Sequence, residues 1–336
     1  MKKIILSLLT LGVLFTSCEN SGWDFPDFGK TSVYFATQTP VRTITLGDDA
    51  YDTTLDNEHK CKIMATMGGV YENKVNRIID FVVDESLCTG LSYEDGSAVL
   101  PMPTSYYTLA SNKITIPKGK VLGGVEVQLT DAFFNDPKSV KTTYVIPLKM
   151  TDVQNADTIL ESKAHILYAL KYKNKWHGYW LSRGKDVIDD NGTVTTVERK
   201  AEFIERDEVR SLATTAYKQV VYPVSTVVKV FIGGVEGTET LHCDLILTFD
   251  DSDNCTITTN TPGCTATGNG KWVYQGAKKA WGDKDRDELT LKYELTYTYQ
   301  QHRPDGPTVY KKYTCDDILV ARDRGSKLES FTVKSN

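Results

Sequence analysis

The amino-acid sequence predicts an all-β protein with two domains. Short runs rich in Val, Thr and aromatic residues recur along the chain, and turns containing Gly, Pro, Asn or Asp separate them. No amphipathic helical pattern of useful length interrupts these runs. A length of 336 residues suits two domains of about 150 residues behind a short leader. We therefore expect a β-sandwich followed by a second β-domain, either an antiparallel barrel or another sandwich.

The first residues predict a signal peptide covering 1–17. Lys2 and Lys3 form a positively charged start, and the apolar stretch 4–15 follows them. This stretch is long enough for the core of a signal peptide and too short to cross a bilayer as a stable helix. The chain is therefore expected to be exported.

Cys18 is expected to become the lipid-modified first residue of the mature protein. Thr16 and Ser17 precede it, and such small residues leave the thiol accessible for acylation. Each buried methylene of an acyl chain contributes about 0.8 kcal/mol, so two or three chains form a lasting anchor. An ordinary secretory peptide with an incidental cysteine is the alternative. Residues 18–30 are expected to form a tether, and its acidic residues resemble the surface-export signal of Bacteroidota lipoproteins: Glu19, Asp24 and Asp27.

The first domain is expected to span residues 31–171. Val125, Val127 and Leu129 alternate with polar residues, which is typical of a strand with one buried face. Pro101 lacks a backbone N–H, so we expect it at the edge or entry of a strand. About eight such strand-like runs, separated by turns, favour an antiparallel sandwich.

Several motifs follow one another through this domain: FVVDESL at 81–87, VLP at 99–101, YYTL at 106–109, ITIPKG at 114–119 and YVIPL at 144–148. Their order resembles an uncharacterised N-terminal domain of Bacteroidota surface lipoproteins. The same domain precedes the family-eighteen endo-β-N-acetylglucosaminidases of Bacteroides. The resemblance implies an immunoglobulin-like β-sandwich that accompanies glycan capture or cleavage without performing the cleavage.

The second domain is expected to span residues 175–336, after a short charged joint. The segment 288–300 alternates most regularly, and about eight runs connected in chain order fit an up-and-down barrel. Gly178-Tyr179-Trp180 is similar to the Gly-x-Trp of lipocalin-like (calycin) barrels, which implies that Trp180 closes one end. The pairing of the two domains also resembles a recurrent Bacteroidota lipoprotein architecture whose second half has no assigned activity.

Charge and motifs argue against several functions. The net charge of −5, without a basic stripe, argues against nucleic acid as a partner. The family-eighteen hydrolases need an Asp-x-x-Asp-x-Asp-x-Glu run; the nearest match starts at Asp186 and Asp189 and lacks the final acid. Residues 283–287 imitate a calcium loop, but Glu288 stands where that loop needs glycine. We therefore expect a protein that is not an enzyme and has no metal or cofactor.

Six cysteines remain after Cys18. If disulfides form within domains, the first half allows one arrangement and the second half allows three. Free, buried thiols are the alternative. The residues concerned are Cys61, Cys88, Cys243, Cys255, Cys264 and Cys315.

Aromatic residues are the candidate binding residues, because the C–H faces of sugars stack on Trp and Tyr. Trp281 leads, since it lies in a polar, Gly-bearing loop where a ring has no evident strand face to bury it. Trp176 ranks next, while His177 is expected to be a hydrogen-bonding bystander. Core packing is the alternative for every one of these rings. The other candidates are Trp272, Tyr274, Tyr297 and Tyr299.

These observations predict a lipid-anchored protein of the outer membrane, exposed at the cell surface. We expect it to bind a glycan or glycoconjugate without catalysis and to support polysaccharide utilisation, next to a glycoside hydrolase or an outer-membrane transporter. The glycan part of this hypothesis rests mainly on the resemblance. A barrel that binds a small apolar ligand is one alternative, and it predicts a buried pocket inside the second domain. A structural or adhesive envelope subunit is the other.

Overall fold

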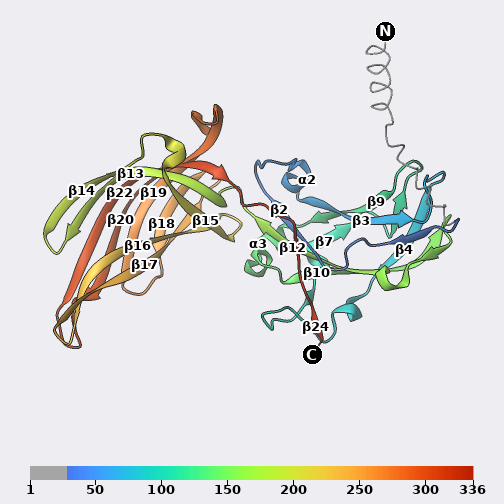
Figure 1. The fold of residues 1–336 in the computed structure, drawn as a ribbon, viewed down its shortest axis with the longest axis horizontal. Helices are drawn as coiled ribbons and strands as arrows, with labels where there is room; N and C mark the ends of the chain where they lie inside the picture. Colours follow the sequence, from blue (N-terminus) through green and yellow to red (C-terminus); the bar gives the residue numbers. More distant parts are fainter. Residues whose placement is uncertain (1–28, 336) are drawn as a thin grey trace, which may run out of the picture.

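The computed structural model describes residues 29–335, in which two β-rich units lie side by side (Figure 1). The α-helices of this part, α2 (Thr54–Asn57) and α3 (Asp131–Asn135), are about one turn each. The all-β prediction is therefore confirmed. No helix among the described residues is long and apolar enough to cross a membrane. The predicted signal peptide, Cys18 and most of the tether lie outside the described residues.

The first unit is a sandwich of two sheets around one apolar core. Each sheet has one apolar face, and packing the two faces together removes both from water. In hydrogen-bonding order, one sheet contains β11 (Thr158–Ile159), β1 (Ser32–Tyr34), β3 (Lys60–Gly68), β9 (Leu122–Leu129) and β7 (Tyr107–Leu109). The other contains β23 (Glu329–Ser330), β2 (Pro40–Thr45), β12 (His165–Lys173), β10 (Tyr144–Gln154), β4 (Arg77–Val83) and β8 (Lys113–Ile116), with β6 (Leu100–Pro101) beside β10.

The alternation predicted for β9 is present. Val125, Val127 and Leu129 are buried in the core, while the residues between them are partly exposed. Pro101 lies in β6, a two-residue strand that pairs only with β10. This position suits proline, because the strand has no second neighbour that would require its N–H.

The second unit is an antiparallel barrel in which strands adjacent in the chain are adjacent in space. Pairing of its first strand with its last, from Tyr179–Asp323 to Asp190–Lys311, closes the barrel. The eight strands of the closed ring are β13 (Gly178–Asp190), β15 (Glu208–Ala216), β16 (Gln219–Ile232), β17 (Val235–Phe249), β18 (Asn254–Thr259), β19 (Cys264–Trp281), β20 (Lys284–Gln300) and β22 (Thr308–Asp323). β14 (Thr193–Arg199) extends the sheet beside β13, and β21 (His302–Arg303) pairs with β16.

The interior of the barrel is filled by the residues that the period-two pattern predicted. Every second residue of β20, from Leu289 to Tyr299, is buried. Trp180 is buried at the end of the barrel near the first unit, and its Nε1 donates to the Trp176 carbonyl oxygen at 3.2 Å. Gly178 is required there, because a Cβ at this position would lie 2.6 Å from the Asp323 carbonyl oxygen.

The C-terminal segment returns to the first unit. β23 pairs with Pro40 and Val41 of β2, and β24 (Lys334–Ser335) pairs with β5 (Leu91–Ser92). The Phe331 ring packs against Tyr93, with 5.2 Å between ring centroids. The range 175–336 expected for the second domain therefore includes a tail whose strands belong to sheets of the first unit. Nothing in the local sequence pattern distinguishes this tail from a barrel strand.

The six cysteines of the described residues are free thiols, so the second of the two alternatives holds in this structure. Burial raises the pKa of Cys61 to about 12 and that of Cys88 to about 11. These thiols therefore stay protonated and act as small apolar residues.

Candidate functional site

Asn174, a buried residue between β12 and β13, fixes the joint of the two units. Its Nδ2 donates to the carbonyl oxygens of Ala216 and Gln219 at 3.0 and 2.9 Å. Its backbone N–H donates to Thr214 Oγ1 at 3.0 Å. Asn174 therefore holds the start of the barrel against the turn between β15 and β16.

Arg324, just after β22, binds backbone carbonyl groups of both units. Its Nη2 donates to Leu46 O at 3.0 Å and to Asn174 O at 2.6 Å. Its Nη1 donates to Asp48 O at 3.2 Å. Burial lowers the pKa of Arg324, and nearby carboxylates, Asp49 and Asp287 first, oppose this effect. The guanidinium still remains charged at neutral pH and clamps the joint.

His177 lies at the same joint. Its Nδ1 accepts a hydrogen bond from the Thr214 backbone N–H at 3.0 Å. Burial, with smaller effects from the cations Lys173 and Arg324, lowers the pKa of His177 to about 3. The imidazole is therefore neutral in the folded protein, and the position fits the hydrogen-bonding role predicted from the sequence.

His177 is expected to make folding sensitive to acid. Its folded pKa lies below its ordinary value of 6.5, so its contribution is complete above about pH 6.5 and is lost as the pH falls towards about 3. In His177→Asn, Oδ1 can accept the same hydrogen bond but does not titrate. The free energy of unfolding, measured with urea at pH 7 and pH 5, should fall about 1–2 kcal/mol less in the variant than in the parent. Equal losses would contradict this assignment.

A groove of about 350 Å³ opens between the two units beside this joint. We call it the joint groove. Its walls carry carboxylates, an amide, two lysines and aromatic rings. The residues that carry these groups are Asn57, His59, Lys175, Trp176, Tyr217, Lys218, Asp250, Asp251 and Asp253.

Lys175 lies at the centre of the groove wall. Its Nζ is 2.7 Å from Asp253 Oδ1. It also lies over two indole rings, 5.2 Å from the centroid of Trp176 and 4.5 Å from that of Trp272. A lysine held over aromatic rings is stabilised by their negative faces.

Trp176 contributes a hydrogen-bond donor that the protein does not use. Its ring stacks on Phe249 with 3.9 Å between centroids, and its exposed fraction is 4%. Its Nε1 has no hydrogen-bond partner among the described residues, and the same holds for Nε1 of Trp272. Buried indole N–H groups normally have a partner, and both of these nitrogen atoms are enclosed by protein, so each is an unsatisfied donor.

The structure brings two of the predicted binding residues, Trp176 and Trp272, together under Lys175, and a third, Tyr274, lies 6.3 Å from Trp272 between ring centroids. Tyr274 is 53% exposed, and its hydroxyl donates to Asp48 Oδ2 of the first unit at 2.5 Å. Trp176 and Trp272 are buried instead, so neither presents an open ring face to a sugar. Both rings pack at the end of the barrel. This is the core-packing alternative that was stated for every candidate ring.

The other three predicted residues lie elsewhere. Trp281 is the last residue of β19 and lies at a tight hairpin rather than in an open loop. The Arg286 guanidinium covers the Trp281 ring, 3.9 Å from its centroid. The indole Nε1 of Trp281 donates to Ala321 O at 3.2 Å. Tyr297 and Tyr299 are buried in the barrel interior. The expectation of a free Trp281 platform overlooked β22, which supplies the surface that the ring packs on.

A polar cluster inside the barrel was not predicted as a site. Arg199 binds both oxygens of Asp186, at 2.6 and 2.9 Å, and also pairs with Asp317, which is fully buried. Asp317 Oδ2 accepts hydrogen bonds from the hydroxyls of Tyr293 at 3.2 Å and Tyr222 at 3.4 Å. Burial raises the pKa of Asp317, and Arg199 opposes this. The alternation of residues along β22 could have indicated this cluster, because it places an aspartate on the inward face of the strand.

The space left beside this cluster is about 60 Å³. That volume holds one or two water molecules and no larger ligand. The alternative of a small apolar ligand predicts several hundred Å³ inside the barrel. Beside this cluster, tyrosines, arginines and aspartates fill the interior of the described barrel and leave no room for such a ligand.

The fold and the joint define a class: a two-unit all-β protein in which a sandwich and a barrel enclose a polar groove. Residues 175–325 match a domain of unknown function, DUF5627, and residues 28–157 match a model of an N-terminal domain. A Bacteroides ovatus structure described as structural genomics, unknown function, is 38% identical, covers 91% of this chain and 99% of its own, and has a TM-score of 0.80. The chain belongs to the same family as this protein.

More distant structures are also similar in part. A second Bacteroides ovatus structure of unknown function is 12% identical, with 89% of this chain and 99% of its own covered and a TM-score of 0.42. An auxiliary nutrient binding protein from Bacteroides thetaiotaomicron is 12% identical, with 86% and 95% covered and a TM-score of 0.37. Likenesses this low support no inference about the function of this chain. No curated protein matches it.

Proposed function

We propose that this protein binds a glycan or glycoconjugate in the joint groove, without catalysis, and that a lipid on Cys18 anchors it to the outer membrane at the cell surface. There it supports polysaccharide utilisation, delivering glycan to a neighbouring hydrolase or transporter. The observation that carries the binding proposal is the groove of about 350 Å³ whose walls bear carboxylates, lysines and aromatic rings, with the unpartnered indole N–H of Trp176 enclosed behind them.

The groove offers the groups that sugar hydroxyls need. Asp251 is exposed and, among residues 29–335, its ion-pair partner is Lys218 at 2.5 Å, so both ends of this pair can exchange partners with a ligand. Tyr217 supplies a partly buried ring beside them, packed against Phe134 at 5.5 Å between centroids. The volume of about 350 Å³ lies within the range of small-ligand sites.

Matched tryptophan variants test the site. Trp176→Phe removes the N–H and keeps an aromatic ring, while Trp281→Phe makes the same change on the β19–β20 hairpin. In a screen of polysaccharides and mucin glycans by affinity electrophoresis and calorimetry, Trp176→Phe should weaken binding about fivefold to tenfold, the value of one buried hydrogen bond. Asp251→Asn, an exposed position, should weaken it about threefold. Trp281→Phe should leave it unchanged.

The opposite pattern, with loss only in Trp281→Phe, would move the site to the hairpin. If no glycan were retained at all while pull-downs recovered a protein partner, the structural or adhesive alternative would replace this proposal. Release of new reducing ends from a bound glycan would contradict the non-catalytic part. Mass spectrometry of the membrane-extracted protein tests the anchor, which predicts an acylated N-terminal Cys18.

A further inference from the structure

A second cavity, of about 500 Å³, lies between β2 and the returning segment 326–329. We call this segment the strap. At its start, Lys173 Nζ donates to the carbonyl oxygens of Arg324 and Gly325 at 3.2 and 3.3 Å. At its end, β23 pairs with β2. Between these two attachments the strap does not pair with β2. The cavity lies between the strap and the unpaired edge of β2.

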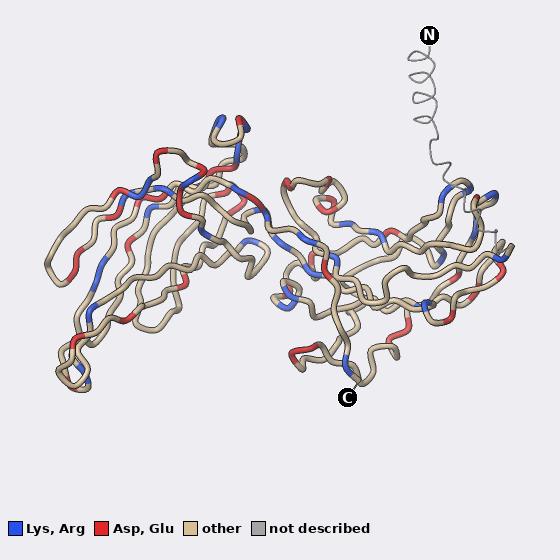
Figure 2. The backbone as a smooth tube through the Cα atoms, viewed as in Figure 1, with Lys and Arg blue, Asp and Glu red and all other residues tan. Residues whose placement is uncertain are grey.

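Basic side chains surround this cavity. Arg42, Lys173 and Lys327 line it, and Figure 2 shows basic segments where the chain passes between the units. Glu329 is the carboxylate of the lining, and Lys171 already pairs with it at 2.7 Å. Among the described residues, neither Lys173 nor Lys327 forms an ion pair. Lys173 and Lys327 are therefore the cations from which an anionic ligand of this cavity would gain most.

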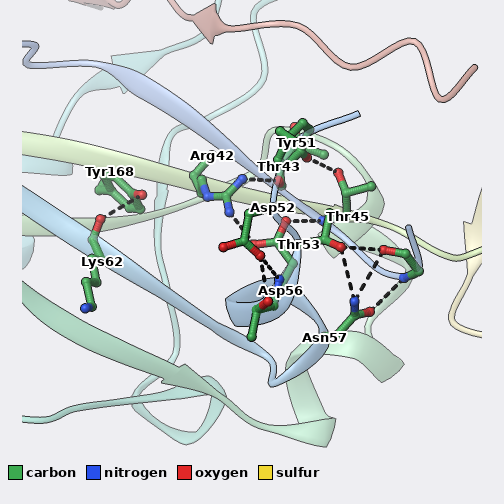
Figure 3. Close-up of polar contacts among 12 residues, drawn as sticks. Arg42, Thr43, Thr45, Tyr51, Asp52, Thr53, Asp56, Asn57, Lys62 and Tyr168 are labelled. Atoms are coloured by element: carbon green, nitrogen blue, oxygen red, sulfur yellow. Dashed lines mark hydrogen bonds and ion pairs between the residues drawn. The ribbon is translucent and has the colours of Figure 1, made fainter. Parts of the chain in front are cut away.

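Arg42 is held in place with donors to spare. Its Nη1 donates to Thr43 O at 2.7 Å, and its Nη2 pairs with Asp56 (Figure 3). Asp56 is itself buried and accepts the Thr45 backbone N–H at 2.9 Å, so its position is fixed. A guanidinium has five N–H donors, and the Arg42 side chain is 31% exposed. Because Asp56 compensates Arg42, Lys173 and Lys327 are the lining cations that have no ion-pair partner among the described residues.

Lys173 would gain from an anion. Burial lowers the pKa of Lys173 and the neighbouring Lys171 lowers it further, while Glu329 and Asp49 oppose this effect. Its ammonium donates to carbonyl oxygens, which carry only partial charge. A carboxylate bound at Lys173 would compensate this cation in a partly buried setting, where such pairs are stronger than at the surface.

Tyr51 provides an apolar wall for the rest of a ligand. Its side chain is 41% exposed, and its hydroxyl donates to Thr45 Oγ1 at 2.8 Å, which orients the ring (Figure 3). Val41 and Leu328 complete the apolar part of the lining. A ring bounded by polar groups suits a ligand that has both C–H faces and hydroxyls.

We propose that the strap cavity binds a carboxylate-bearing sugar of monosaccharide size, with the carboxylate on Lys173 and the sugar ring on Tyr51. This site is separate from the joint groove, so it stands or falls independently of the glycan proposed there. Lys327, an exposed residue of the lining, adds a weaker contact.

Calorimetry on the full-length protein tests the proposal with three probes: galacturonate, galactose and sulfate. Galacturonate should bind, galactose should bind at least about tenfold more weakly, and sulfate should compete only at much higher concentration. Raising the salt concentration should weaken galacturonate binding. Equal binding of galactose, or equal competition by sulfate, would overturn the proposal in favour of a neutral-sugar site or a non-specific anion site.

Three lysine variants of the same type locate the site. Lys173→Gln should weaken galacturonate binding about tenfold and Lys327→Gln about threefold, because Lys327 is the more exposed. Lys118→Gln removes the same charge from an exposed turn that does not line the cavity, and should leave binding unchanged. If Lys118→Gln weakened binding as much as Lys327→Gln, or if Lys327→Gln had no effect, the strap cavity would not be the site.

Discussion

Replacing Arg199 with methionine is expected to lower the free energy of unfolding of the barrel by about 3–5 kcal/mol. Arg199 compensates Asp186 and Asp317 together, and the Asp317 side chain is 1% exposed. Without the guanidinium, two carboxylates remain close together in a buried layer that holds little water. Urea denaturation followed by circular dichroism measures the change.

The double variant Arg199→Met/Asp317→Asn separates charge from packing. Asparagine keeps acceptors for the Tyr222 and Tyr293 hydroxyls but carries no charge, so about half of the lost stability should return. Arg206→Met is the matched control, because Arg206 is exposed near the same strand. A single variant Arg199→Met as stable as Arg206→Met would show that the buried carboxylates do not depend on Arg199.

Replacing Arg324 with leucine should release the joint between the units. The substitution removes three charge-assisted hydrogen bonds to Leu46, Asp48 and Asn174. Water can replace part of what is lost, so we expect a cost of about 3 kcal/mol rather than the full sum. Limited proteolysis should cut the connection at 173–176 faster in this variant, and the melting temperature should fall.

Arg322→Leu is the control for this change. Arg322 lies in β22, two residues before Arg324, is exposed, and within the described part of the chain forms a surface ion pair with Asp323 at 3.6 Å. Such pairs contribute about 0–1 kcal/mol. Equal cleavage rates in the two variants would mean that Asn174 and its hydrogen bonds hold the joint without Arg324.

Sequence patterns predicted those parts of the fold that depend on neighbours along the chain. Alternation in β9 and β20 determines which side chains face a core, because successive residues of a strand point to opposite faces. The same alternation points Asp317 inward, and Gly178 leaves room for the close approach of Asp323. The prediction of an all-β chain with a meander-connected second half follows from these local patterns.

The candidate sites depend on residues that are far apart in the chain. The joint groove combines Asn57, Trp176 and Asp251, and the strap cavity combines Arg42, Lys173 and Lys327. No local spacing relates these positions. Trp281 illustrates the reverse case: its polar loop predicts exposure, but β22 from 40 residues away in the chain accepts its N–H.

The sequence by itself determined the class of fold, the inward and outward faces of the strands, and the export hypothesis centred on Cys18. The tertiary structure alone decided that the C-terminal tail returns to the sandwich, that Trp176 and Trp272 meet under Lys175, and that positive charge gathers beneath the strap. The physical reason is that the faces of a strand are set by backbone geometry between adjacent residues. The position of a cavity depends on which strand edges remain unpaired once the sheets have formed. Those edges in turn depend on pairings between strands from all parts of the chain.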